Sequence, residues 1–141
     1  MLGSSIFKTV DIMLINTMDD VEDKIGYKFK NRNDLNIILN RITLDKRGDY
    51  RILAGKGDAL LRFVAWEYLV TTEDVFKSDK KTFKEEFGER INDIVSDKNL
   101  RKIAANMGLA LTADGVEGLL GAVYSDGGFE EAKKVAKRML E

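Results

Sequence analysis

Apolar residues recur at three- and four-residue steps along most of this 141-residue chain, which is the spacing of amphipathic helices. No stretch shows the strict alternation of apolar and polar residues that marks a half-buried strand. Proline is absent, so glycine supplies the breaks between elements. The pattern predicts an all-α fold with a short helix that carries Leu35, Ile38 and Leu39 and with helices over residues 6–16, 18–25, 57–71, 79–95, 97–107, 113–126 and 129–140.

Capping residues and glycine set the expected bounds. Asn31 or Asn33 is a candidate N-cap for the short helix, and Ser78 is a candidate for the helix over 79–95. Residues 43–56 are polar and contain glycine, so we expect a loop there, with the long helix beginning only near residue 57.

Two aromatic residues lie on the apolar faces of these helices. Trp66 falls on the long helix and Phe129 begins the last one. Both are expected to belong to the core, because an apolar face of a helix in a globular protein packs against its neighbours.

Length and composition restrict the number of domains and the cellular location that we expect. A chain of this length fits one domain with its own core. Cysteine is absent, so disulfides and thiolate metal sites are excluded, and a cytoplasmic location is the simplest expectation. No apolar run approaches the roughly 20 residues of a membrane span, and residues 1–5 carry no basic segment of a secretory signal. We therefore expect no contact with a membrane.

The absence of histidine limits the chemistry that the chain can perform. It removes serine–histidine nucleophile pairs, histidine metal ligands and histidine general bases. Carboxylates remain, and they suit hard cations such as Mg²⁺ or Mn²⁺. The net charge of −1 argues against a high-affinity nucleic-acid binder, but it leaves room for an enzyme whose bound metal neutralises an acidic site.

Three carboxylates form the candidate site. Asp114 and Glu117 are three positions apart on one predicted helix, so they share a face, and that face carries Gly118 and Gly121, which allow another helix to approach closely. Asp58 stands at the expected start of the long helix. The three side chains would converge on a divalent cation if the two helices cross.

Simpler interpretations compete with this one. Asp58 at a helix start could be a cap, and an acidic pair at this spacing is usually a solvated helix face. Spacing alone favours these simpler interpretations. The acidic pair, however, lies within the most apolar helix of the C-terminal half, where charge needs a reason, and metal binding would be one.

Four blocks of sequence resemble the catalytic domain of the ribonuclease III family. Residues 57–61 (GDALL) resemble its signature helix, and residues 113–129 (ADGVEGLLGAVYSDGGF) resemble its second acidic helix with the turn that follows. Residues 25–31 and 95–109 resemble its N-terminal and middle helices. The blocks stand in the family's order over residues 18–141, which leaves residues 1–17 as an N-terminal extension that could form an added helix.

The resemblance implies a ribonuclease III-type endonuclease domain of the compact, Mini-ribonuclease III-like kind, without an RNA-binding domain. It implies a hydrolase that cuts double-stranded or structured RNA with Mg²⁺ or Mn²⁺, leaves 5′-phosphate and 3′-hydroxyl ends, and works as a twofold homodimer. By position, Asp58, Asp114 and Glu117 match metal-site carboxylates of the family, and Asp58 and Glu117 would be catalytic.

The chain departs from the family's signature just before Asp58. Arg51 and Ala54 stand where the family has glutamates, and alanine cannot coordinate a metal, although Mini-ribonuclease III similarly has a small apolar residue there. Gly55 replaces the aromatic residue that plugs into the partner subunit, so the dimer interface would differ or be weaker. Lys56 would either contact an RNA phosphate or be a solvated loop lysine, and we favour the second.

These departures keep a second function open. A non-catalytic ribonuclease III-like module, which binds RNA or serves as a subunit of a ribonucleoprotein assembly, would show such losses. A helical interaction domain with no role in RNA biology is a third, weaker alternative. A group of lysines could contact the RNA backbone: Lys77, Lys80, Lys81 and Lys84. We interpret this group instead as an exposed helix face, because glutamates interleave with it.

Overall fold

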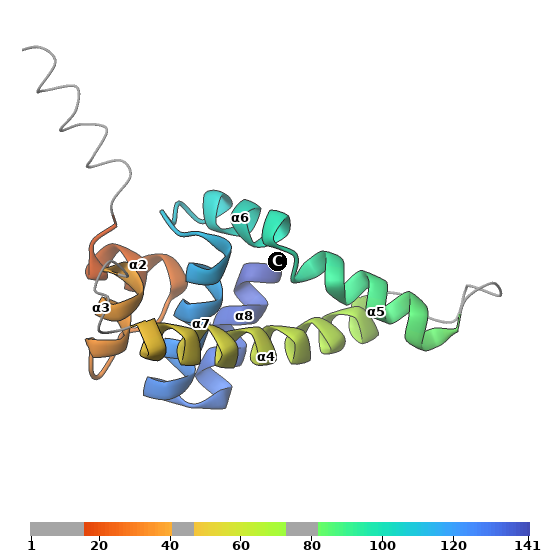
Figure 1. Cartoon of the computed structure of the whole chain (residues 1–141), viewed down its shortest axis with the longest axis horizontal. Coiled ribbons are helices and arrows are strands. Elements are labelled where there is room, and N and C mark those ends of the chain that lie inside the picture. Colours follow the sequence, from red (N-terminus) through yellow and green to blue (C-terminus); the bar gives the residue numbers. More distant parts are fainter. Residues whose placement is uncertain (1–15, 41–46, 73–81) are drawn as a thin grey trace, which may run out of the picture.

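A computed structural model describes residues 16–40, 47–72 and 82–141, and every regular element within these ranges is a helix (Figure 1). The all-α prediction is therefore confirmed for them. The predicted helix over 6–16 lies outside the described residues except for its last position, and the predicted cap Ser78 lies outside them entirely. The helices are α2 (Met18–Ile25), α3 (Asn33–Leu39), α4 (Arg47–Thr72), α5 (Phe83–Ile94), α6 (Asp97–Asn106), α7 (Ala113–Gly127) and α8 (Phe129–Leu140).

Hydroxyl side chains cap most of these helices. Thr17 caps α2 with a capping box, and Thr82, Ser96 and Thr112 each accept a hydrogen bond from the backbone N–H of the third residue of α5, α6 and α7, respectively. The sequence placed α2 and α8 at the observed bounds and α6 and α7 within one residue of them. At α3, the Asn31 side chain accepts a hydrogen bond from the backbone of the first helical residue at 2.9 Å, although it lies two positions before it.

The predicted loop over 43–56 is wrong for residues 47–56, because α4 begins ten residues before Gly57. The glycines in this stretch are compatible with helix, and Gly57 is required by packing. A Cβ added at Gly57 would lie 1.6 Å from the Glu117 carbonyl oxygen, and one added at Gly121 would lie 1.9 Å from the Leu53 carbonyl oxygen. The two helices therefore cross backbone to backbone at glycine. Asp58 consequently lies inside a helix and cannot be an N-cap.

The core gathers around α7. This helix packs against α3, α4, α6 and α8, and Figure 1 shows α4 running along the domain and crossing it. The face of α4 that carries Leu53, Gly57 and Val64 is buried against it. Fully buried side chains from five helices complete the core, among them Val21, Leu35, Leu61, Leu100, Val116, Leu119, Leu120 and Val123.

Polar contacts tie the N-terminal part of the structure to the C-terminal half. The Asp126 carboxylate, near the end of α7, accepts a hydrogen bond from the Tyr27 hydroxyl at 2.6 Å and from the backbone N–H groups of Lys30 and Asn31 at 2.8 and 3.0 Å. The Lys24 ammonium donates to the Gly108 carbonyl oxygen at 3.0 Å. Residues of α2 and of the segment after it are thus held by residues roughly a hundred positions further along the chain.

A row of large apolar side chains remains exposed, and we call it the apolar stripe. On α4 it lies on the face turned away from α7, as the helical spacing of its members shows. It includes Trp66 and Phe129, 39% and 38% exposed, so the prediction that both are core residues is wrong. Its members are Ile52, Phe63, Trp66 and Val70 of α4, Tyr124 of α7 and Phe129 of α8. No helix in the described ranges has the length and apolar character that crossing a membrane requires.

Candidate active site

The crossing of α4 and α7 brings two of the three predicted site residues into contact. Gly57 packs on the backbone of Glu117, so the next residue of α4, Asp58, is placed beside the Glu117 side chain. The two carboxyl groups share a hydrogen bond. Glu117 is half-buried at the crossing, whereas the Asp58 side chain is 39% exposed. Nothing in the sequence of either helix shows directly that Asp58 and Glu117 meet.

This environment changes the acidity of Glu117. Burial, the hydrogen bond to Asp58 and the negative charges of Asp58, Asp114 and Asp97 raise the pKa of Glu117 from 4.5 to about 8. Without a bound cation, the pair therefore keeps a proton at neutral pH, with Glu117 donating to Asp58. A divalent cation at this place would replace that proton, because the ligating carboxylates must be ionised.

Asp114 and Asp97 surround the pair at longer range. Asp114 is exposed one turn before Glu117 on α7, and Asp97 is the first residue of α6. Within the described ranges, no three acidic, histidine or cysteine side chains stand close enough together to hold an ion between them. Mg²⁺, however, commonly takes only one or two protein carboxylates and completes its shell with water and substrate phosphates. The Asp58–Glu117 pair fits such an ion, and the roles of the three carboxylates as ligands stay predictions.

A basic residue outside the predicted set, Arg62, also reaches this site. The Nε atom of Arg62 lies 3.3 and 3.2 Å from the two carboxylate oxygens of Asp58, and its Nη1 atom lies 3.3 Å from Oδ1 of Asn92 on α5. Arg62 follows Asp58 by four residues on one helix, a spacing at which side chains meet. That spacing could have identified Arg62, whereas Asn92 and Asp97 come near only through tertiary packing.

Of the departures from the family's signature, Arg51, Gly55 and Lys56 are exposed on α4, whereas Ala54 is half-buried. Gly55 is exposed, and a Cβ there would meet no atom within 4 Å. Lys56 is exposed, as expected of a solvated lysine, but it lies in α4, so its expected place in a loop is wrong. Its ammonium lies 3.3 Å from the Ser125 hydroxyl of α7. Of the lysine group, Lys84 is exposed at the start of α5, and the other three lie outside the described residues.

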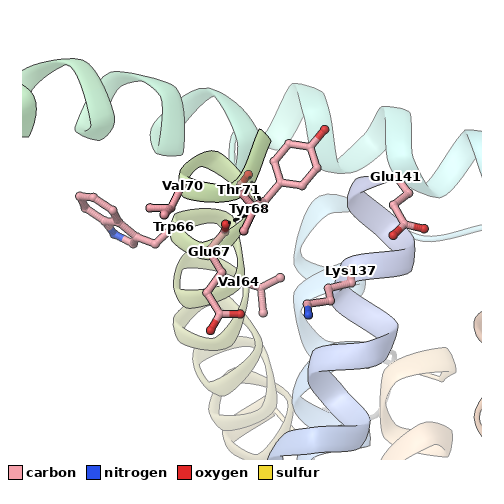
Figure 2. A pocket seen from close by; sticks show the side chains of 8 residues that line it. All are labelled: Val64, Trp66, Glu67, Tyr68, Val70, Thr71, Lys137 and Glu141. Atoms are coloured by element: carbon pink, nitrogen blue, oxygen red, sulfur yellow. Dashed lines mark hydrogen bonds between the residues drawn. The ribbon is translucent and has the colours of Figure 1, made fainter. Parts of the chain in front are cut away.

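Two cavities lie along the apolar stripe, apart from the carboxylates. One of about 380 Å³ is lined by Lys56, Ala59, Leu60, Phe63, Tyr124 and Phe129. Another of about 700 Å³ lies at the C-terminal end of α4, where Figure 2 shows Trp66, Val70 and Val64 on one side and Lys137 of α8 and Glu141, which follows α8, on the other. Neither contains Asp58, Asp114 or Glu117, so these hollows are features of the apolar surface and not of the acidic site.

Comparisons with known proteins agree with the motifs. No family model matches the chain. It is 25% identical over 146 residues to the protein named Ribonuclease 3 of Campylobacter fetus subsp. fetus, and 29% identical over 142 residues to Ribonuclease 3 of Fusobacterium nucleatum. These alignments include 90% and 83% of this chain but 63% and 58% of the relatives, so the chain spans about three fifths of their length.

Solved structures give the same result for the fold. The crystal structure of the nuclease domain of ribonuclease III from Campylobacter jejuni matches with a TM-score of 0.71 at 25% identity, over 90% of this chain and 95% of that one. A second structure of that domain, which describes structural flexibility in a region involved in its dimer formation, also matches with a TM-score of 0.71. The resemblance that the four sequence blocks indicate is thereby confirmed, and the helices of the described residues have the fold of the ribonuclease III nuclease domain.

Proposed function

We propose that this chain is a metal-dependent endoribonuclease that hydrolyses phosphodiester bonds of double-stranded or structured RNA and leaves 5′-phosphate and 3′-hydroxyl ends. The observation that carries the proposal is the contact of Asp58 with Glu117 at the glycine crossing of α4 and α7. The names of the relatives support the same activity, although the chain spans only part of their length. A cytoplasmic location without membrane contact remains a prediction.

The two contacting carboxyl groups have the chemistry that this reaction requires. The raised pKa of Glu117 means that the pair holds a proton in excess, which an Mg²⁺ or Mn²⁺ ion would displace. When bound, such an ion supplies an activated water and stabilises the charge that develops on the leaving oxygen. Asp58 and Glu117 would hold it, and Asp114, exposed on the same face of α7, would hold it directly or through water.

The decisive experiment measures cleavage of a duplex RNA by the full chain with Mg²⁺, with Mn²⁺ and with a chelator. We expect cleavage with either metal and none with the chelator. Glu117→Gln should fold normally and lose at least a hundredfold in rate, since it removes a ligand. Glu130→Gln, an exposed change on α8, is the matched control and should cleave like the wild type. A wild-type protein that cleaves no duplex RNA with either metal would refute the proposal.

We also propose that the chain works as a homodimer through the apolar stripe. Six large apolar side chains of α4, α7 and α8 are 38 to 59% exposed, and three of them, Phe63, Tyr124 and Phe129, line one cavity together. Adjoining exposed apolar side chains of this kind mark an interaction site. The cavity of about 380 Å³ within the stripe could receive side chains of a second copy. Because Gly55 offers no plug, this contact would depend on α4, α7 and α8 surfaces instead. Sedimentation of the purified chain would show a dimer if the proposal holds.

A second candidate function is a non-catalytic module that binds RNA or joins a ribonucleoprotein assembly. It is favoured by Ala54, which provides no oxygen ligand at the position where the family has a glutamate. Calorimetric titration with Mn²⁺ separates the two functions. An inert module should show no binding that Glu117→Gln abolishes, whereas the enzyme should.

A further inference from the structure

Arg62 is held between two helices at the edge of the acidic site. Its Nε atom approaches both oxygens of Asp58, at 3.3 and 3.2 Å, and its Nη1 atom approaches the Asn92 side-chain oxygen on α5 at 3.3 Å. The described structure also contains a comparable pair four residues apart, Glu86–Arg90, but that glutamate is not part of the acidic site. Arg62 therefore neutralises a residue whose charge the proposed reaction needs.

Asp58 thus has a partner on each side. Glu117 shares a hydrogen bond with it from α7, and Arg62 donates to it from the next turn of α4. A divalent cation at the pair would stand close to the guanidinium, and the two positive charges would repel. Since the Arg62 side chain is 46% exposed, it can turn toward solvent without disturbing the core.

We propose that Arg62 is a resident cation of the acidic site, which competes with the divalent metal ion for the Asp58 carboxylate and thereby sets the metal affinity. This inference rests on the proposed function, because it assumes that Asp58 is a ligand. Arg62 is a positioning residue that acts through Asp58. Exposed ion pairs are worth up to about 1 kcal/mol, which corresponds to about a fivefold change in a binding constant.

The test is calorimetric titration of the full chain with Mn²⁺, which reads metal affinity independently of cleavage. Arg62→Gln should bind Mn²⁺ about three- to fivefold more tightly than the wild type, and Arg62→Lys, which keeps the charge, should restore affinity to within about twofold of it. Arg90→Gln removes the same charge from the comparable pair on α5 and should also stay within about twofold.

A second variant leaves Arg62 itself in place. Asn92→Ala removes the acceptor on α5 and should loosen the guanidinium, so Mn²⁺ binding should tighten relative to Arg90→Gln, but less than in Arg62→Gln. Circular dichroism confirms that each variant folds. If Mn²⁺ binding is detectable in Arg62→Gln but too weak to detect in the wild type, that result also supports the proposal.

The outcomes separate the two claims. If the wild type binds Mn²⁺ and cleaves RNA but Arg62→Gln binds equally or more weakly, the competition is overturned while the proposed function stands. If neither the wild type nor Arg62→Gln binds Mn²⁺, the proposed function fails and the inference fails with it.

Discussion

Replacing Gly57 with alanine adds one methyl group at the point where α4 crosses α7. On the present backbone that methyl carbon would lie 1.6 Å from the Glu117 carbonyl oxygen, whereas carbon–oxygen contacts in proteins are about 3.3 Å or longer. The helices must therefore separate by more than an ångström, and the obstacle is backbone that cannot turn aside. Over-packing of a core typically costs about 1 to 3 kcal/mol, and a clash this close belongs at the upper end.

The matched control is Gly55→Ala, two residues earlier on the same helix. An added methyl there would meet no atom within 4 Å, so only helix propensity acts, and alanine should stabilise by about 0.5 to 1 kcal/mol. The same gain partly offsets the clash at Gly57, which leaves a net loss of about 2 kcal/mol. The two variants should therefore differ by about 3 kcal/mol in the free energy of unfolding.

Urea denaturation followed by circular dichroism, at one protein concentration, measures this difference. Because the clash also pushes Asp58 away from Glu117, Gly57→Ala should weaken Mn²⁺ binding, and Gly55→Ala should not. Equal stability of the two variants would refute the close crossing of α4 and α7 and the placement of the carboxylates that follows from it.

Three further predictions address acidity and association. The raised pKa of Glu117 means that the folded, metal-free protein holds a proton that the unfolded chain releases, so the free energy of unfolding should fall as the pH rises from 4.5 to about 8. Glu117→Gln should remove this decline and be about 1 to 2 kcal/mol more stable than the wild type at pH 8, a figure reduced for solvent screening. Urea titrations at pH 5 and 8 with a chelator measure the difference. Burial alone would raise the pKa of Asp126, but hydrogen bonds from Tyr27 and two backbone N–H groups hold it below its usual 3.8. The stability that the Asp126 carboxylate contributes should therefore be present above that pH and lost as the pH falls further. Asp126→Asn should cost about 1 to 2 kcal/mol at pH 7 and show a shallower acid transition, and an unchanged acid transition would contradict this. Phe63→Lys places a charge in the apolar stripe and should raise the dissociation constant of a homodimer at least about tenfold in sedimentation experiments. A dimer of unchanged affinity would place the interface elsewhere.

The sequence predicts those parts of the fold whose causes are local. Thr112 caps α7 next to a regular apolar pattern, Thr17 caps α2, and α8 begins directly after Gly128 without a side-chain cap. The start of α4 is missed because glycine usually breaks helices, while Gly57 is there to admit the backbone of another helix, which no local pattern reveals.

The candidate site divides in the same way. Asp58 and Glu117 are identifiable from motif and spacing, and Arg62 is identifiable from its position four residues after Asp58. The contact between Asp58 and Glu117, and the approach of Asn92 to Arg62, depend on how helices pack. Sequence spacing along one helix cannot supply the distance between two helices.

The hydrogen bonds of Asp126 have a consequence for the order in which this domain folds. They join positions 95 to 99 residues apart, and the Lys24–Gly108 contact spans 84. During synthesis, α2 and α3 leave the ribosome long before α7 exists, so they must wait without these partners. Contacts so distant along the chain slow folding, because the entropy of closing a long loop is lost before the contacts form. We expect the N-terminal helices to dock late, when α7 offers them a surface.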